Sequence, residues 1–444
     1  MSQGGQEGRL RRLRRWLRPG MGIKRWLLVM LVGLTVLATA GALLIRILFR
    51  EVPADTLLGQ LFELVSLNFL PDLLRPLVVI AIGVAVFLYG LWRLLSALLE
   101  PFPARREPLM DMVYQKRSLA RGPRIVAIGG GTGLSTLLRG LKEVSSNITA
   151  VVTVADDGGS SGQLRRELGV PPVGDIRNCI VALADVEPTM SKLMQYRFPA
   201  SESEPGIAGH AFGNLLIAAM ADITGDFEEG VRQSNRVLAV RGEVVPVAGQ
   251  ALSLSAELAD GSQLQGQSRI MRSRGIRRVW LSPAGVEASP EAVEAIRRAD
   301  LIVIGPGSLY TSLLPSLLVP GIRSAVESAH ALRVYVANVA TQPGETEGYT
   351  LSQHVAALAA HGVGNLVDIV LANDDEGARV PDGYPAEPVR IDLPFGDARP
   401  RLELAAVVDP DNAHRHDPRR LTQVLVRLLA ERPAAQPALP VPGA

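Results

Sequence analysis

Two adjacent carboxylates stand where an apolar, strand-like run of the chain stops. In ITAVVTVADDGGSSG, Asp156 and Asp157 follow the run and precede a glycine-rich segment. An acid at the end of such a strand can accept the ribose hydroxyls of a nucleotide. Two neighbouring carboxylates can instead hold a hydrated Mg²⁺ that bridges phosphates, or the segment can be an ordinary turn, for which these residues are typical. We therefore keep Asp156 and Asp157 as candidate nucleotide ligands and as the candidate metal ligands.

A glycine turn comes one strand earlier. In IVAIGGGTGLSTLLRGL, a short apolar run leads into Gly130, Gly131, Thr132 and Gly133. An amphipathic helix pattern follows, with its inner face formed by Leu134, Leu137, Leu138 and Leu141. Glycine lets backbone amides approach an anion closely, and a helix N-terminus attracts negative charge. Leu134 stands where the third glycine of G-x-G-x-x-G would be, and no G-K-[ST] follows, so both nucleotide fingerprints are incomplete. We predict a phosphate site, with a tight structural turn as the alternative.

A second strand followed by a glycine turn is predicted in ADLIVIGPGSLYTSLLP. Its amides and hydroxyls can also face an anion, and the candidate residues are Gly305, Gly307, Ser308, Tyr310 and Thr311. Two later strand-like runs end at Asn338 and Asn373. Polar residues at several strand ends indicate a site at one edge of a sheet.

Four further polar residues open apolar helix patterns. Asp175 is expected to cap a helix, which would explain it without a ligand, and Asn178 lies on the first turn. His210 and Asn214 are four residues apart, one helical turn. A ligand contact and a histidine bonded to backbone are equally good interpretations of His210. No H-E-x-x-H motif or cysteine cluster is present, so no zinc site is predicted.

The elements that must position these residues form an α/β pattern. The order strand, helix, strand over residues 125–154 predicts a right-handed parallel crossover, which brings both strand ends to the same edge. Alternating residues around Asp260-Gly261 predict an antiparallel hairpin. Cys179, the single cysteine, lies in an apolar run and is expected in the core.

The first hundred residues have a different composition. An uncharged apolar run extends from Trp26 to Ile45, and a second from Leu77 to Trp92. About 20 apolar residues cross a bilayer as a helix, so a two-helix membrane hairpin is expected. Arginines before the first run and after the second predict cytoplasmic ends. The cell membrane is the expected location, multi-pass, with the large domain cytoplasmic.

The 444 residues carry a formal net charge of +2, which does not call for a nucleic-acid partner. We expect five parts: a basic cytoplasmic segment (1–25), the membrane hairpin (26–100), a linker (101–121), a nucleotide-binding domain (122–431) and a disordered tail (432–444). The tail is rich in proline and alanine.

Several long motifs resemble those of one family. IVAIGGGTGLSTLLRGLK, TVADDGGSSGQLRRELGVPPVGDIRNCIVALAD, GHAFGNLLIAAM, IGPGSLYTSLLPSLLVPGI and VYVANVATQPGET are similar to the gluconeogenesis factor (YvcK-like) proteins of the CofD superfamily. The resemblance covers roughly residues 124–429.

The resemblance implies a Rossmann-like, three-layer parallel sheet (CofD-like) and the binding of a nucleotide sugar such as UDP-N-acetylglucosamine, with Mg²⁺ as an optional cofactor. It implies a bacterial regulator of cell shape and cell-wall precursor metabolism, with a cell-wall or peptidoglycan-synthesis protein as the expected partner and a homo-oligomer as a further option. The family's Arg-His-Asp stretch, linked to nucleotide-sugar binding, matches Arg415-His416-Asp417. No catalytic residue is assigned.

The other branch of the superfamily supplies the rival function. It is an enzyme that transfers a phospholactyl-type group from a nucleotide-activated donor, with Asp156 or Asp157 holding Mg²⁺ and the glycine turns stabilising the diphosphate leaving group. A nicotinamide-dependent dehydrogenase depends only on the incomplete glycine fingerprint and ranks last.

Overall fold

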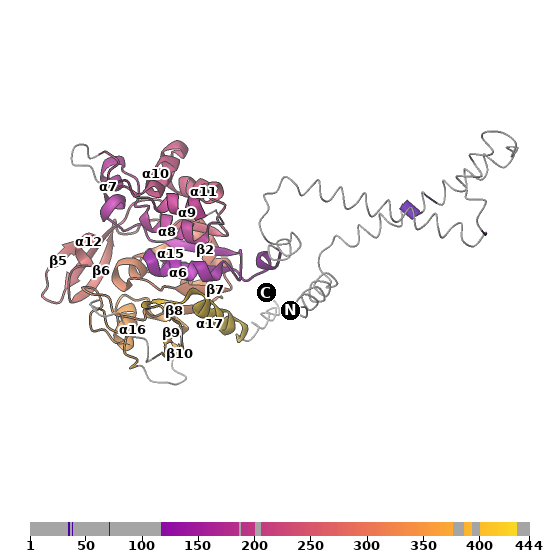
Figure 1. The fold of residues 1–444 in the computed structure, drawn as a ribbon. Helices are drawn as coiled ribbons and strands as arrows, with labels where there is room; N and C mark the ends of the chain where they lie inside the picture. The colour runs from indigo at the N-terminus through magenta and orange to yellow at the C-terminus, as the bar shows by residue number, and fades with distance from the viewer. Residues whose placement is uncertain are drawn as a thin grey trace, which may run out of the picture. The chain divides into compact units, whose positions relative to one another are not determined.

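Figure 1 shows the chain in a computed structural model, which divides into two compact units, Met1–Arg106 and Glu107–Ala444. The structure describes residues 117–185, 188–199, 206–375, 386–392 and 400–432, and the isolated positions 34, 35, 38 and 71. Nearly all of the predicted membrane hairpin and its flanking segments lies outside this range. Across the described residues, no helix combines the length and the apolar composition that crossing a bilayer requires.

A seven-stranded parallel sheet forms the centre of the second unit, in the order β10-β9-β8-β7-β1-β2-β3. The strands are β1 (Ile125–Gly129), β2 (Ile148–Val152), β3 (Glu243–Pro246), β7 (Leu301–Ile304), β8 (Leu332–Val336), β9 (Ile369–Asn373) and β10 (Arg401–Ala405). All seven strands point the same way, but β1 to β3 are added toward one edge of the sheet and β7 to β10 toward the other edge. The order therefore reverses between β1 and β7, where parallel α/β sheets bind ligands beyond their carboxyl ends.

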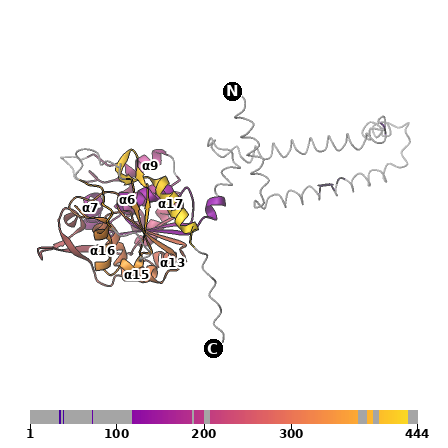
Figure 2. The same ribbon diagram turned by 90° about the horizontal axis from the view of Figure 1, so that it is seen from below.

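Helices cover both faces of this sheet (Figure 2), with α6 and α17 on one side and α13, α15 and α16 on the other. Those on the first side and above it are α6 (Gly131–Leu141), α7 (Gly159–Leu168), α8 (Gly174–Leu183), α9 (Pro188–Gln195), α10 (Phe212–Thr224), α11 (Phe227–Val237) and α17 (Pro418–Ala430). The remaining ones are α12 (Gln267–Ile270), α13 (Pro290–Arg298), the π-helix η1 (Leu309–Leu313), α14 (Leu314–Leu317), α15 (Pro320–Ser328), α16 (Leu351–Ala360) and the 3-10 helix η2 (Gly364–Leu366). The expected three-layer α/β fold is confirmed.

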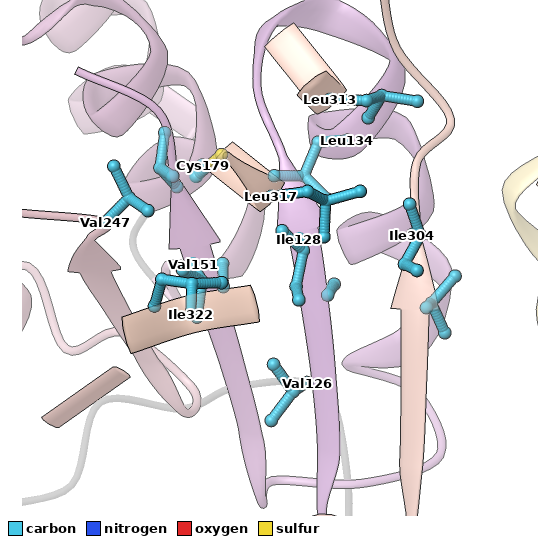
Figure 3. Close-up of a cluster of buried hydrophobic side chains, with 14 of the residues drawn as sticks. Val126, Ile128, Leu134, Val151, Cys179, Val247, Ile304, Leu313, Leu317 and Ile322 are labelled. Atoms are coloured by element: carbon cyan, nitrogen blue, oxygen red, sulfur yellow. The ribbon is translucent and has the colours of Figure 1, made fainter. Parts of the chain in front are cut away.

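The core lies between the sheet and these helices (Figure 3). The leucines predicted on the inner face of α6 are fully buried: Leu134, Leu137, Leu138 and Leu141. Ile128 of β1, Ile304 of β7 and Leu313 of η1 belong to the same buried cluster as Leu134. Cys179 is buried in the same core as expected, and burial raises the pKa of its thiol well above the usual value.

Two small antiparallel sheets complete the described fold. The predicted hairpin at Asp260-Gly261 joins β4 (Ser253–Leu258) to β5 (Gln263–Gln265), and β6 (Ile276–Ser282) pairs with the other edge of β4. The second sheet pairs β11 (Val408–Asp409) with β12 (Asn412–His416). The first sheet carries α12, and the second carries Arg415, so each brings side chains from outside the main sheet.

Candidate functional site

A cavity of about 480 Å³ lies at the carboxyl ends of β1 and β7, where the strand order reverses. Its described lining comprises residues 130–133, Thr136, Asp156, Asp175, Gln267, Met271, residues 306–308, Ser312, residues 338–343, Ala386 and residues 414–416. Segments far apart in the sequence therefore meet at one edge of the sheet, as the strand ends predicted.

The candidate residues divide into two groups. The cavity is lined by Gly130, Gly131, Thr132, Gly133, Asp156, Asp175, Gly307, Ser308, Asn338 and Arg415. The described lining does not include Asp157, Asn178, Gly305, His210, Asn214, Tyr310 or Thr311. The residues of the second group have contacts within the fold that explain them.

The first glycine turn presents the N-terminus of α6 to the cavity. Gly131 has φ +68°, a left-handed conformation that favours glycine. The N-cap residue of α6 is Gly130, which has no side chain to cap the helix, and the first turn of α6 holds no acidic residue. The partial positive charge of the helix end is therefore directed into the cavity, as an anion site requires.

The second glycine turn packs directly against the first. A Cβ atom on Gly133 would lie 2.6 Å from the carbonyl oxygen of Pro306, and one on Gly307 would lie 3.3 Å from that of Gly130. Asn338 fastens the second turn, because its Nδ2 donates to the Gly307 carbonyl (3.0 Å) and its Oδ1 accepts from the Gly307 N–H (3.3 Å). The two turns form one continuous wall.

Asp175 is half-buried in this wall and does not cap its own helix, contrary to the expectation. It lies inside the first turn of α8, and its carboxylate accepts from the N–H of Gly131. A Cβ on Gly130 would come within 2.5 Å of Asp175 Oδ2, so only glycine lets the carboxylate lie there. Burial, with Asp156 nearby, raises the pKa of Asp175 to about 7. This carboxyl can exchange a proton near neutral pH.

The two aspartates of the opening motif point to different places. Asp156 lines the cavity, and its Oδ1 accepts from the N–H of Gly158 (2.9 Å). Burial raises its pKa above the usual range. Asp157 accepts from the N–H of Ser268 at the start of α12 (2.8 Å) and lies against Gly266. Asp157 thereby holds the small β4-β5-β6 sheet beside the cavity.

The metal hypothesis fits a different pair of carboxylates better than the predicted one. Asp156 and Asp175 both line the cavity, whereas Asp157 faces Ser268. No group of three or more His, Cys, Asp and Glu side chains that could hold a metal ion is found in the described ranges. Mg²⁺ needs only one or two carboxylates when phosphates and waters complete its shell, so Asp156 and Asp175 fit such an ion.

Two walls of the cavity were missed from the sequence. Gln267 begins α12, Met271 directly follows this helix, and residues 340–343 come after β8. The Gln267 side chain donates to the carbonyl of Thr311 (3.3 Å), which ties α12 to the second turn. The hairpin pattern predicted β4 and β5, but nothing local to residues 267–271 indicates that they reach this cavity.

The Arg-His-Asp stretch has three separate functions in the fold. Arg415 on β12 is exposed and lines the cavity. His416 is buried, its Nε2 lies 3.2 Å from the carbonyl oxygen of Ala337, and burial lowers its pKa to about 4. Asp417 caps α17 by accepting from the N–H groups of Arg419 and Arg420 (both 2.8 Å). His416 and Asp417 therefore anchor the strand that carries Arg415 to the cavity.

Tyr310 and Thr311 bind a carboxyl group that belongs to the protein itself. Glu345 accepts from their backbone N–H groups (2.6 and 3.1 Å) and from the Thr311 hydroxyl (3.0 Å). Glu345 is 2% exposed, and burial raises its pKa to about 7. Gly305 has φ +84° and holds the sharp bend before this segment.

His210 and Asn214 converge on one hydroxyl. Ser160 Oγ lies 3.0 Å from His210 Nδ1 and accepts from Asn214 Nδ2 (3.0 Å), with all three side chains buried. Asn178 Oδ1 accepts from Arg177 (2.9 Å). These contacts tie α10 to the N-terminus of α7, which indicates a positioning function beside the site.

Comparison with known proteins assigns the whole described domain. The family model described as "2-phospho-L-lactate transferase CofD" matches residues 125–407. The "Gluconeogenesis factor" of Bacillus subtilis is 46% identical over 323 residues, which cover 70% of this chain and 100% of the relative. A protein of Nostoc sp. is 45% identical over 429 residues, covering 93% of this chain and 92% of the relative.

A solved structure agrees with the fold. The crystal structure of a UPF0052 family protein from Bacillus halodurans superposes with a TM-score of 0.64 and 43% sequence identity, and it covers 69% of this chain and 99% of its own. The seven-stranded parallel sheet and the cavity wall at its reversal point thus belong to a domain found in related proteins. This chain is a member of the gluconeogenesis factor family, built on a CofD domain.

Proposed function

We propose that the cavity binds a nucleotide sugar of the UDP-N-acetylglucosamine type, and that the chain uses this ligand to regulate cell shape and cell-wall precursor metabolism. The observation that carries the proposal is the contact between the two glycine turns, with α6 and Arg415 at the same cavity. Backbone amides, a helix N-terminus and a guanidinium are the groups that proteins use for a diphosphate. Cavities of a few hundred Å³ suit ligands of this size.

Binding with no chemistry is the favoured form of this function. No catalytic residue is assigned. Polar side chains next to the two glycine turns, where the diphosphate would lie, are held in place by the backbone. Asn338 is bonded to Gly307, and Asp175 is bonded to Gly131. A preorganised binding site of this kind suits a ligand that is bound and then released without chemical change.

A phospholactyl-type transferase is the second candidate, and one observation favours it. Asp156 and Asp175 face the same cavity, and both have raised pKa values because of burial. Mg²⁺ held by such a pair would stabilise a diphosphate leaving group. Asp175, with a pKa of about 7, could also take a proton from an acceptor hydroxyl.

One experiment separates the two functions. The full-length chain is titrated with UDP-N-acetylglucosamine by calorimetry and then incubated with the ligand and Mg²⁺, with and without a hydroxylated acceptor. A regulator binds the ligand and returns it unchanged, whereas a transferase releases free nucleotide only when acceptor is present. Absence of binding at millimolar ligand would remove the nucleotide-sugar assignment.

Arg415→Ala tests the site itself. Loss of a charge-assisted contact to phosphate should lower the affinity for UDP-N-acetylglucosamine about tenfold or more. Arg419→Ala is the matched control, because Arg419 is an equally exposed arginine on α17 outside the described cavity lining. Equal affinities for the two variants would contradict the placement of the diphosphate next to Arg415.

We further propose that residues 26–100 tether this domain to the cell membrane as a two-helix hairpin, with the domain in the cytoplasm. The support is the pair of uncharged apolar runs and the arginines that flank them. A reporter enzyme that works only in the cytoplasm should therefore be active when it is fused after Ala444. Activity of an extracellular reporter at the same position would overturn this topology.

A further inference from the structure

A second cavity lies beside the first. It has a volume of about 540 Å³ and lies at the carboxyl ends of β8 and β9, next to β10. Asn338 and Val339 line both cavities, and Ala413 in the second directly precedes the residues 414–416 that line the first. A ligand seated at the glycine turns can therefore continue past Asn338 into this space.

The two cavities differ in chemistry. Much of the second one is aliphatic, with Ala337 and Val339 from the segment after β8, Ala372 from β9 and Leu404 from β10. Its polar groups are fewer and include Asp374 and Arg390, both exposed. Flat aromatic rings gain most from such an aliphatic wall with a few polar groups beside it.

The far end of the first cavity has the opposite character. Asp156 and Gln267 line it, with Asp175 beside them against the first glycine turn. Carboxylate and amide oxygens accept hydrogen bonds from hydroxyl groups, and a polyhydroxylated sugar must keep such bonds when it leaves water. This end suits a sugar, whereas the aliphatic space suits a nucleobase.

Building on the nucleotide-sugar function proposed above, we infer that the second cavity is the nucleoside subsite. The base lies against Ala372 and Leu404, the diphosphate lies at the glycine turns, and the sugar lies toward Asp156 and Gln267. The pyrimidine nucleoside thus occupies the β8-β9 side of the reversal point, and the sugar occupies the β2 side.

Asp374 supplies the ribose contact. Its neighbour Asn373 is used by the fold, because Asn373 Oδ1 accepts from the N–H of Val407 (3.2 Å) and its Nδ2 donates to the carbonyl of Asp375 (3.3 Å). These bonds fix the end of β9, and the exposed Asp374 follows at the cavity. A carboxylate at the end of a parallel strand is well placed to accept ribose hydroxyls.

The first test narrows the second cavity. Ala413→Phe places a ring in it from β12, where Ala413 is only partly buried. The affinities of the full-length chain for UDP and for UDP-N-acetylglucosamine should fall by the same factor, about tenfold or more, because both ligands carry the nucleoside. Thermal unfolding of the variant checks that the fold is retained.

The second test changes one surface side chain and one ligand atom. The unmodified chain should prefer UDP over 2′-deoxy-UDP by about threefold to tenfold, the size of one hydrogen bond. Asp374→Ala should remove this preference and leave the binding of 2′-deoxy-UDP unchanged. Because Asp374 is exposed, this variant is expected to fold even if Ala413→Phe does not.

Each other outcome overturns a defined statement. If Ala413→Phe lowers the affinity for UDP-N-acetylglucosamine but not the affinity for UDP, the second cavity holds the sugar and the inferred orientation is wrong. If neither ligand is affected, or if Asp374→Ala keeps the preference for UDP, the second cavity is not the nucleoside subsite. If the unmodified chain binds neither ligand, the proposed function fails, and the subsite fails with it.

Discussion

The two glycine turns of the cavity wall present the same sequence pattern and meet different anions. The turn after β1 faces Asp175, which lines the cavity, and the turn after β7 leads into η1, whose amides are bound by Glu345. Burial raises the pKa of both carboxyls to about 7. Only Asp175 is in contact with the cavity, since Glu345 is 2% exposed and outside the described lining.

The difference shows that two similar turns can present different groups to one cavity. Amides exposed by a glycine turn need an acceptor. In η1 the amides of Tyr310 and Thr311 already have an acceptor in the protein, Glu345. This segment therefore forms a fixed part of the wall. At α6 the protein supplies Asp175 at one amide and leaves the uncapped helix end at the cavity. The first turn therefore keeps a helix end for a ligand, while Gly307 and Ser308 of the second turn complete the lining beside it.

Glu345→Ala should have the largest effect if Glu345 is structural. The substitution leaves two buried N–H groups and the Thr311 hydroxyl without their acceptor. The free energy of unfolding should fall by about 3 kcal/mol or more, as measured by urea denaturation. Glu345→Gln keeps one acceptor oxygen and should cost about half as much.

The pH dependence of stability provides a control for Glu345. Its pKa is raised from 4.5 to about 7 on folding, so the folded chain binds this proton more tightly than the unfolded chain. Stability from this group is complete below about pH 4.5 and is lost as pH rises to about 7. The loss should be smaller in Glu345→Gln. An unchanged pH profile would show that Glu345 is ionised like a surface carboxylate.

Gly133→Ala tests the contact between the two turns and should have the next largest effect. The added Cβ would lie 2.6 Å from the Pro306 carbonyl oxygen, which forces the turns apart. We expect a loss of about 1–3 kcal/mol in stability and about tenfold or more in affinity for UDP-N-acetylglucosamine. Gly206→Ala is the matched control, because a Cβ there has no neighbour within 4 Å.

The sequence was sufficient to predict the parts of this wall that are local. The strand, glycine turn and helix of residues 125–141 are contiguous, and the apolar period placed Leu134 and Leu138 inward, as found. The same pattern at β7 and the polar strand ends predicted that distant segments would meet at one edge. These features depend on the periodicity of helices and strands, which is visible in short stretches of the sequence.

The candidate residues that lie outside the described cavity lining have partners far along the chain. Asp157 bonds Ser268, 111 residues later, and Ser160 meets His210, 50 residues later. Glu345 binds amides 34 and 35 residues earlier. A carboxylate after a strand looks the same in sequence whether it faces a ligand or a backbone amide. Only the packing of α12 and η1 against the main sheet distinguishes these cases.

Asp175→Asn sharpens the comparison with the smallest expected effect. Asp175 loses its proton as pH rises through about 7, and the resulting charge repels a diphosphate. With a metal chelator present, affinity for UDP-N-acetylglucosamine should fall about fivefold from pH 6 to pH 8, since two unit charges 4 Å apart in water interact by about 1 kcal/mol. The Asp175→Asn variant should bind the ligand equally at both pH values. Asp157→Asn is the control: it changes the carboxylate that faces Ser268, so it should keep the wild-type decrease in affinity.

The opposite result would contradict this assignment. If Asp157→Asn abolished the pH dependence of affinity and Asp175→Asn did not, the cavity carboxylate would be Asp157, and the contrast with Glu345 would no longer hold. Added Mg²⁺ should reverse the trend, because the ionised Asp175 then gains a cation to bind.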